Sequence, residues 1–235
     1  YIKAAEWWVE QLSCLFSIIT EPANYVDDED VFNPAEATER LLSVEQLFRD
    51  CQSILTLTRD DHARTSLAFT LLKRLEGLIP GYRWKTVVGR NSLEAIVEKL
   101  RTDVPTELHD VFLWRAERAV RAVAALEHGF FSAGEDPESP VYLPDKNGIR
   151  VATDRRHAVT EWLQLVRNSL HGFDKPSERD RALLAAHDGD ISGDFADVAW
   201  LHLLDIVANP DKLAKFARRS KMNTGRPRRG AGHRT

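Results

Sequence analysis

The chain has 235 residues, of which 43% are hydrophobic and 29% charged, and its formal net charge at pH 7 is −4. A chain of this length suits one large helical domain or two small ones. No apolar run approaches the length of a membrane span, and the charged residues Lys3 and Glu6 near the start exclude a signal peptide. We therefore expect a soluble protein. Cys14 and Cys51 are isolated from each other, which argues against a disulfide framework or a cysteine zinc site and favours a reducing cytoplasm.

Helical periodicity dominates the first part of the chain. Residues 2–20 predict a helix whose Trp7 and Trp8 belong in the core or a dimer contact, in preference to a base-stacking platform. Because the chain begins within this helix and without methionine, we expect a piece of a longer protein. After an acidic run at 27–30, interpreted as a solvated loop, Asn33-Pro34 predicts the start of a helix that runs to about residue 58.

Further helices are predicted over 60–77, 91–100 and 106–131, with Pro80-Gly81 marking a break. Glycine and proline then indicate an irregular insert, 133–153, in which 141–143 and 149–151 predict a short hairpin. The residues expected on the buried side of the longest helix are Val111, Leu113, Ala119, Val120, Val123, Leu126 and Phe130.

The next predicted helix begins near Thr153 or Asp154 and stops at Gly172; others follow over 179–187, over 194–208 and from 209. The aspartates at 188–194 open like a calcium loop, but Ala199 stands where the bidentate glutamate is needed, so a turn that caps the next helix is favoured. The fold class expected is all-α, a bundle with a small β-hairpin insert.

Charge divides the chain into a body, 1–211, and a tail, 212–235. Nine of the 32 basic residues and none of the 36 acidic ones lie in the tail, so the body holds 23 basic against 36 acidic residues, a net charge of −13. An acidic body argues against a broad surface that coats nucleic acid, although a local basic cleft remains compatible with it. The tail is expected to be disordered and either binds phosphates or is an inert terminus.

The candidate catalytic residues are Arg167, Asn168 and His171, at the end of a helix with an apolar stripe (Val159, Leu163, Val166, Leu170). The i,i+4 spacing places Arg167 and His171 side by side at the border of that stripe. Arginine grips phosphate, histidine moves a proton near neutral pH, and asparagine can orient either one, so the set could cleave RNA without a metal. The alternative is a purely structural pair that complements the helix dipole and the last carbonyls.

Arg167-Asn168…His171-Gly172 resembles the motif of the HEPN superfamily, in which four to six residues separate the arginine from the histidine; here three do. A spacing of four to six intervening residues also occurs at three other places, namely Arg121 with His128, Arg150 with His157 and Arg181 with His187. Over about 154–210, the resemblance implies a HEPN-like helical bundle, a homodimer and a composite metal-independent endoribonuclease site built on Arg167, Asn168 and His171. It also implies a role as a toxin or antiphage defence effector, with a cognate antitoxin or partner protein.

Two alternatives stay open: a non-catalytic HEPN-like module for dimerisation or partner binding, and a regulatory helical domain of a longer protein. No cofactor is expected. His157, His187 and His202 are scattered, and their spacing does not demand a metal site.

Overall fold

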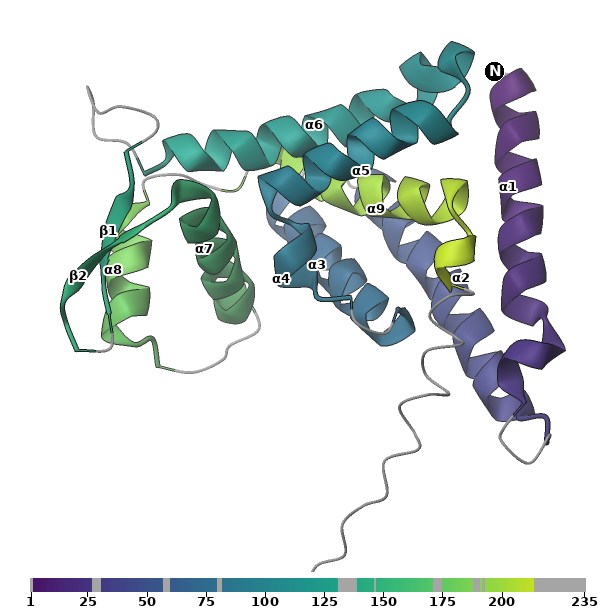
Figure 1. Cartoon of the computed structure of the whole chain (residues 1–235), viewed down its shortest axis with the longest axis horizontal. Helices are drawn as coiled ribbons and strands as arrows, with labels where there is room; N and C mark the ends of the chain where they lie inside the picture. Colours follow the sequence, from purple (N-terminus) through teal and green to yellow (C-terminus); the bar gives the residue numbers. More distant parts are fainter. Residues whose placement is uncertain are drawn as a thin grey trace, which may run out of the picture.

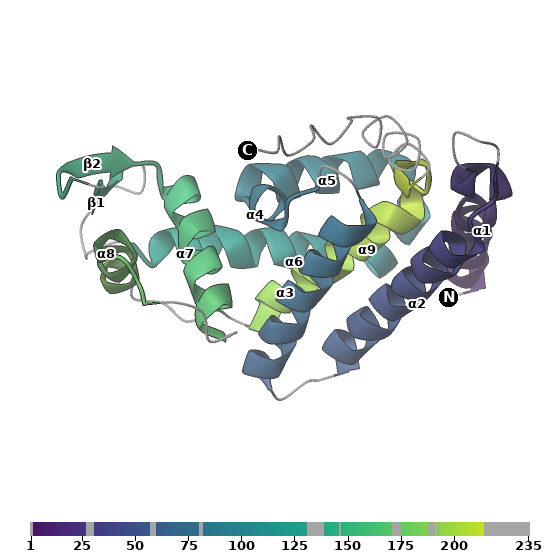
Figure 2. The same cartoon turned by 90° about the horizontal axis from the view of Figure 1, so that it is seen from below.

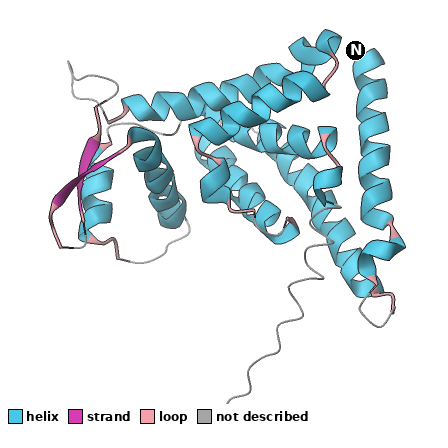
Figure 3. Ribbon diagram, viewed as in Figure 1, coloured by secondary structure: helices cyan, strands magenta, loops and turns pink. Residues whose placement is uncertain are grey.

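The computed structural model describes residues 2–26, 31–56, 60–79, 82–130, 139–145, 147–170, 175–187, 191 and 193–213. Helices dominate these residues, and two strands form one small sheet among them (Figure 3). The elements are α1 (Ile2–Thr20), α2 (Pro34–Thr56), α3 (Asp61–Leu78), α4 (Trp84–Val87), α5 (Arg90–Asp103), α6 (His109–His128), β1 (Val141–Pro144), β2 (Arg150–Thr153), α7 (Arg155–Leu170), α8 (Glu178–Ala186) and α9 (Asp197–Ala208).

The helix starts that the sequence signals most clearly lie where predicted. The Asn33 side chain accepts a hydrogen bond from the Glu36 amide at 3.2 Å, and Pro34 is the first residue of α2. Asp60 caps α3 by accepting from the Ala63 amide at 2.9 Å. Each contact satisfies an amide that has no partner within its own helix, so these boundaries are local properties of the chain.

α9 occupies the centre of the molecule. It contacts α1, α2 and α3 as well as α5 and α6, and Figures 1 and 2 show it between these groups of helices. Ten of its residues are buried, including His202 and Asp205. Because the buried residues fall on all sides of α9, the helix has no broad face for solvent and requires such an enclosed position.

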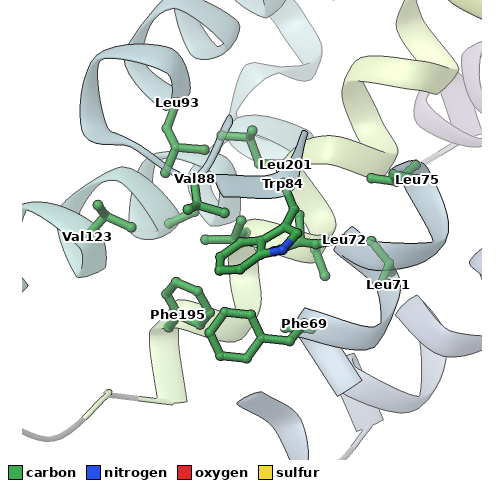
Figure 4. Close-up of a cluster of buried hydrophobic side chains, with 14 of the residues drawn as sticks. Phe69, Leu71, Leu72, Leu75, Trp84, Val88, Leu93, Val123, Phe195 and Leu201 are labelled. Carbon is green, nitrogen blue, oxygen red and sulfur yellow. The ribbon is translucent and has the colours of Figure 1, made fainter. Parts of the chain in front are cut away.

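An aromatic core joins α3, α4 and the 3-10 turn that leads into α9 (Gly193–Ala196). The ring of Phe69 lies 5.4 Å from that of Trp84, edge to face, and 5.3 Å from that of Phe195 (Figure 4). Trp84 belongs to α4, a single turn that the sequence analysis did not predict. Four residues are too few to show a helical period, so this turn depends on burial of its tryptophan.

A second aromatic cluster closes the end of the molecule next to α1. Trp8 stacks on Trp200 of α9 at 5.6 Å, and Trp7 lies 5.0 Å from Phe112 of α6. The expectation that both tryptophans serve packing is therefore confirmed. The predicted buried face of α6 is wrong at Val111, which is 36% exposed: Phe112 is turned inwards instead, onto these indole rings.

The predicted hairpin is present at the opposite end, beside α7 and α8 (Figure 1). β1 and β2 pair antiparallel, with Val141 opposite Thr153. Asp145 holds the turn by accepting from the amides of Asn147 (2.8 Å) and Ile149 (2.9 Å). Gly148 has φ +78°, a conformation that costs glycine little.

The predicted all-α class with a small hairpin is confirmed. In the part of the chain described, no helix combines the length and the apolar character needed to cross a bilayer. The predicted tail lies outside the described residues beyond Leu213.

Candidate functional site

α7, the helix of the predicted site, begins at a capping aspartate and has two contrasting faces. Asp154 accepts a hydrogen bond from the His157 amide at 3.1 Å. Val159 and Leu163 are fully buried and Val166 packs against the same core, as the predicted apolar stripe requires. The fourth member of the stripe, Leu170, has a side chain outside the described part.

Arg167 and Asn168 lie in the last turn of α7, and both are half-buried. The Arg167 Nη1 donates to the Asn168 Oδ1 at 3.2 Å, so the amide already orients the guanidinium. His171 and Gly172 lie outside the described residues. The structure therefore brings together two of the three predicted catalytic residues, and the meeting of Arg167 with His171 stays a prediction.

A polar cleft of about 530 Å³ opens between α7 and the start of α5. We call it the α7 cleft. Gly89, the N-cap of α5, and the first residues of that helix line one side of the cleft. Its lining consists of Lys85, Thr86, Gly89, Arg90, Asn91, Ser92, Asp154, Arg156, His157, Thr160, Glu161 and Gln164.

Ion pairs tie the arginines of this cleft to neighbouring helices. Arg90 contacts Glu94 at 2.8 Å and Glu127 of α6 at 3.1 Å. Arg156 lies 3.9 Å from the same Glu127 and donates to the Asn91 side chain across the cleft. The Arg156 side chain keeps 42% of its surface exposed, which leaves it able to contact a ligand.

A histidine and a carboxylate form a pair at the rim. The His157 Nε2 lies 3.1 Å from Glu161 one turn later, and Glu161 also accepts from Arg179 of α8 at 2.8 Å. The His157 side chain is 65% exposed. A carboxylate that orients an exposed imidazole is an arrangement used for general acid–base chemistry.

The sequence analysis missed this pair and this cleft. A signal was available: polar residues stand at 156, 160, 164 and 167, on one helix face next to the apolar stripe of α7. At about 100° and 1.5 Å per residue, Arg167 lies on the same face as Arg156, roughly 16 Å along the axis. The lining of the cleft ends at Gln164, one turn before Arg167.

The other histidines considered from sequence have structural surroundings. His187 is buried, stacks on Trp162 at 3.9 Å, and its Nε2 lies 2.9 Å from the Leu126 carbonyl oxygen. His202 is enclosed by the core. Within the described ranges, no group of three histidines, cysteines or carboxylates is arranged to hold a metal ion.

Comparisons with protein-family models, with curated proteins and with solved structures find no match for this chain. The resemblance to the HEPN superfamily therefore depends on the sequence alone, above all on the motif Arg167-Asn168…His171-Gly172.

Proposed function

We propose that this protein binds RNA along the polar face of α7 and cleaves it without a metal ion. The observation that supports this most directly is the alignment of Arg167 with Arg156 on one helix face, where the α7 cleft opens. The planar guanidinium group of arginine donates two parallel hydrogen bonds to phosphate oxygens. Arginines in line along one helix face can therefore contact successive phosphates of a nucleic-acid strand. The acidic body confines nucleic acid to this local basic strip.

The chemistry proposed is transfer within the RNA strand. His171 takes the proton of a ribose 2′-hydroxyl as that oxygen attacks the adjacent phosphorus. The bond from phosphorus to the 5′-oxygen breaks and this oxygen takes up a proton, which yields a 2′,3′-cyclic phosphate and a 5′-hydroxyl. Arg167, oriented by Asn168, stabilises the charge on the phosphorane.

The test is cleavage of a fluorophore-labelled RNA in excess EDTA. We expect Arg167→Ala and His171→Ala each to lower the rate at least 100-fold without unfolding the chain, as loss of a phosphate clamp or a proton-transfer group does. Arg150→Ala, an exposed arginine of β2, is the matched control and retains full activity.

Two results would contradict parts of this proposal. Full activity of His171→Ala together with loss in His157→Ala would move the proton transfer to the His157–Glu161 pair. Cleavage that requires a divalent cation, or no turnover of any RNA by folded protein, would reject the metal-independent ribonuclease.

A second candidate function, assembly with another copy of the chain, is favoured by the outer face of α1. Ile2, Val9 and Phe16 are 77%, 61% and 37% exposed and stand seven residues apart. A seven-residue apolar repeat forms one line along a helix and is typical of helix–helix contacts between chains. α1 lies at the edge of the molecule (Figure 1), and its buried residues are Ala4, Leu15 and Ile19, none of which belongs to this line.

Sedimentation equilibrium tests the assembly separately from activity. We expect a dimer for the native chain and a monomer for Val9→Glu, while Ile149→Glu, an equally exposed apolar position in the hairpin turn, stays dimeric. A native monomer at concentrations up to about 100 µM, where even a weak dimer with a Kd near that value is populated, would reject α1 as the contact.

A further inference from the structure

The α7 cleft continues the predicted site along the same helix. Its lining on α7 extends from Asp154 to Gln164, and Gln164 precedes Arg167 by three residues, so these two side chains are neighbours on the helix surface. At 1.5 Å per residue, Arg156 lies about 16 Å from Arg167 along the axis. A nucleic-acid strand that has one phosphate at Arg167 and follows the polar face of α7 therefore enters this cleft.

Two cationic side chains line the cleft from different helices. Arg156 belongs to α7, and 42% of its side-chain surface is exposed. Lys85 is an exposed residue of α4, the single turn that contacts α7. A guanidinium and an ammonium at one opening suit a group that spreads negative charge over several oxygens, as a phosphate does.

The carboxylates around the cleft have contacts of their own. Glu161 accepts a hydrogen bond from Arg179 at 2.8 Å, and the capping aspartate of α7 accepts one from a backbone amide of its own helix. Glu127 accepts from Arg90 at 3.1 Å but lies 3.9 Å from Arg156, which is beyond hydrogen-bond distance. The charge of Arg156 is thus only partly offset within the protein and can act on a ligand in the cleft.

The distance between the two arginines sets the length of strand that can contact both. The lining residues between them on this face, Thr160 and Gln164, are polar and uncharged, so neither repels a phosphate. Along a stacked strand successive nucleotides are about 3.4 Å apart, so a separation of about 16 Å corresponds to about five nucleotides.

We propose that Lys85 and Arg156 form a clamp for a second phosphate of the RNA, about five nucleotides from the phosphate at Arg167. This inference rests on the proposed function, because it takes the polar face of α7 as the path of the strand. It defines the substrate as an RNA strand long enough to reach both positions. An octanucleotide reaches both of them and a trinucleotide reaches one. The two clamp residues bind and position the strand, and they take no part in proton transfer.

Binding of RNA that cannot react tests the clamp without relying on cleavage. A 2′-O-methyl strand lacks the hydroxyl that attacks phosphorus, so fluorescence anisotropy of labelled trinucleotide and octanucleotide strands with the whole chain measures binding alone. We expect Arg156→Ala and Lys85→Ala each to weaken octanucleotide binding about tenfold at low salt, as loss of a hydrogen bond to a charged group does. The slope of log affinity against log salt concentration should fall by about 0.7, the value for one phosphate contact with a single strand. Trinucleotide binding should change far less, because the position at Arg167 remains.

The matched control is Arg150→Ala, at an exposed arginine outside the cleft, which should keep the native octanucleotide affinity and salt slope. Lys85 is exposed, so Lys85→Ala still tests the clamp if Arg156→Ala does not fold. Absence of octanucleotide binding, equal binding by the native chain and both clamp variants, or an equal loss in Arg150→Ala would overturn the clamp. Binding that depends on the clamp in a protein that cleaves no RNA would support the clamp and reject the ribonuclease, so the two failures are distinguishable.

Discussion

Mild acid should destabilise this protein through the buried His202 of α9. His202 lies in the core of α9, where desolvation first and the nearby Lys212 second lower its pKa to about 3; its hydrogen bond with the Val87 backbone opposes both. Tyr82 and Asp205 are the other titratable groups that, with His202 and Lys212, line a cavity of about 200 Å³ between α3, α4, α5 and α9. In the unfolded chain a histidine has a pKa near 6.5, so between about pH 6.5 and pH 3 the unfolded state binds a proton at this residue and the native state does not.

The magnitude follows from linkage. The stability due to the neutral ring is fully present above pH 6.5 and is lost by about 1.4 kcal/mol for each pH unit as the pH falls towards 3. Between pH 7.5 and pH 5.0 the loss is about 2 kcal/mol, or roughly 4–8 °C in Tm for a chain of this size. The direction is opposite to that of a histidine stabilised by a carboxylate, which would gain stability in acid.

The assay is urea unfolding at pH 7.5 and pH 5.0 on the native chain and on His202→Leu, with His62→Leu as the control at an exposed histidine. The difference in unfolding free energy between the two pH values should shrink by about 2 kcal/mol in His202→Leu and stay unchanged in His62→Leu. An identical pH dependence in the native chain and in His202→Leu would refute the reasoning, as would a His202 imidazole that titrates near pH 6 by NMR.

Two other predictions concern buried groups. Asp197 is fully buried and lies 3.1 Å from both Arg115 and Arg118, so Asp197→Ala should lower the free energy of unfolding in urea by about 2 kcal/mol. This loss is smaller than the 3–5 kcal/mol expected for a fully buried ion pair because both arginines reach water. An unchanged unfolding midpoint would contradict the prediction. Burial raises the pKa of Cys51 to about 12, whereas Cys14 is exposed. A thiol reagent at pH 8 should therefore label one cysteine in the native chain and two in urea. Rapid labelling of both cysteines without urea would contradict the prediction, because it would show that Cys51 is accessible.

Parts of the candidate site are local in sequence and parts are not. Arg167 and Asn168 are adjacent, and their contact needs only the last turn of a helix. His157 and Glu161 are four residues apart, a spacing that a helical wheel brings together, so this pair could have been found. The α7 cleft could not have been found from the sequence, because its opposite wall, around Asn91, belongs to α5, more than sixty residues earlier in the chain.

The all-α class, the hairpin and most helix boundaries follow from the sequence by itself. Caps such as Asn33 and Asp60, the turn at Asp145 and the apolar period act over a few residues, so their energetics do not depend on the rest of the fold. Only the tertiary structure decided which of Val111 and Phe112 faces inwards and that His202 meets Tyr82. Those outcomes depend on burial against helices distant in sequence, where packing outweighs local preference.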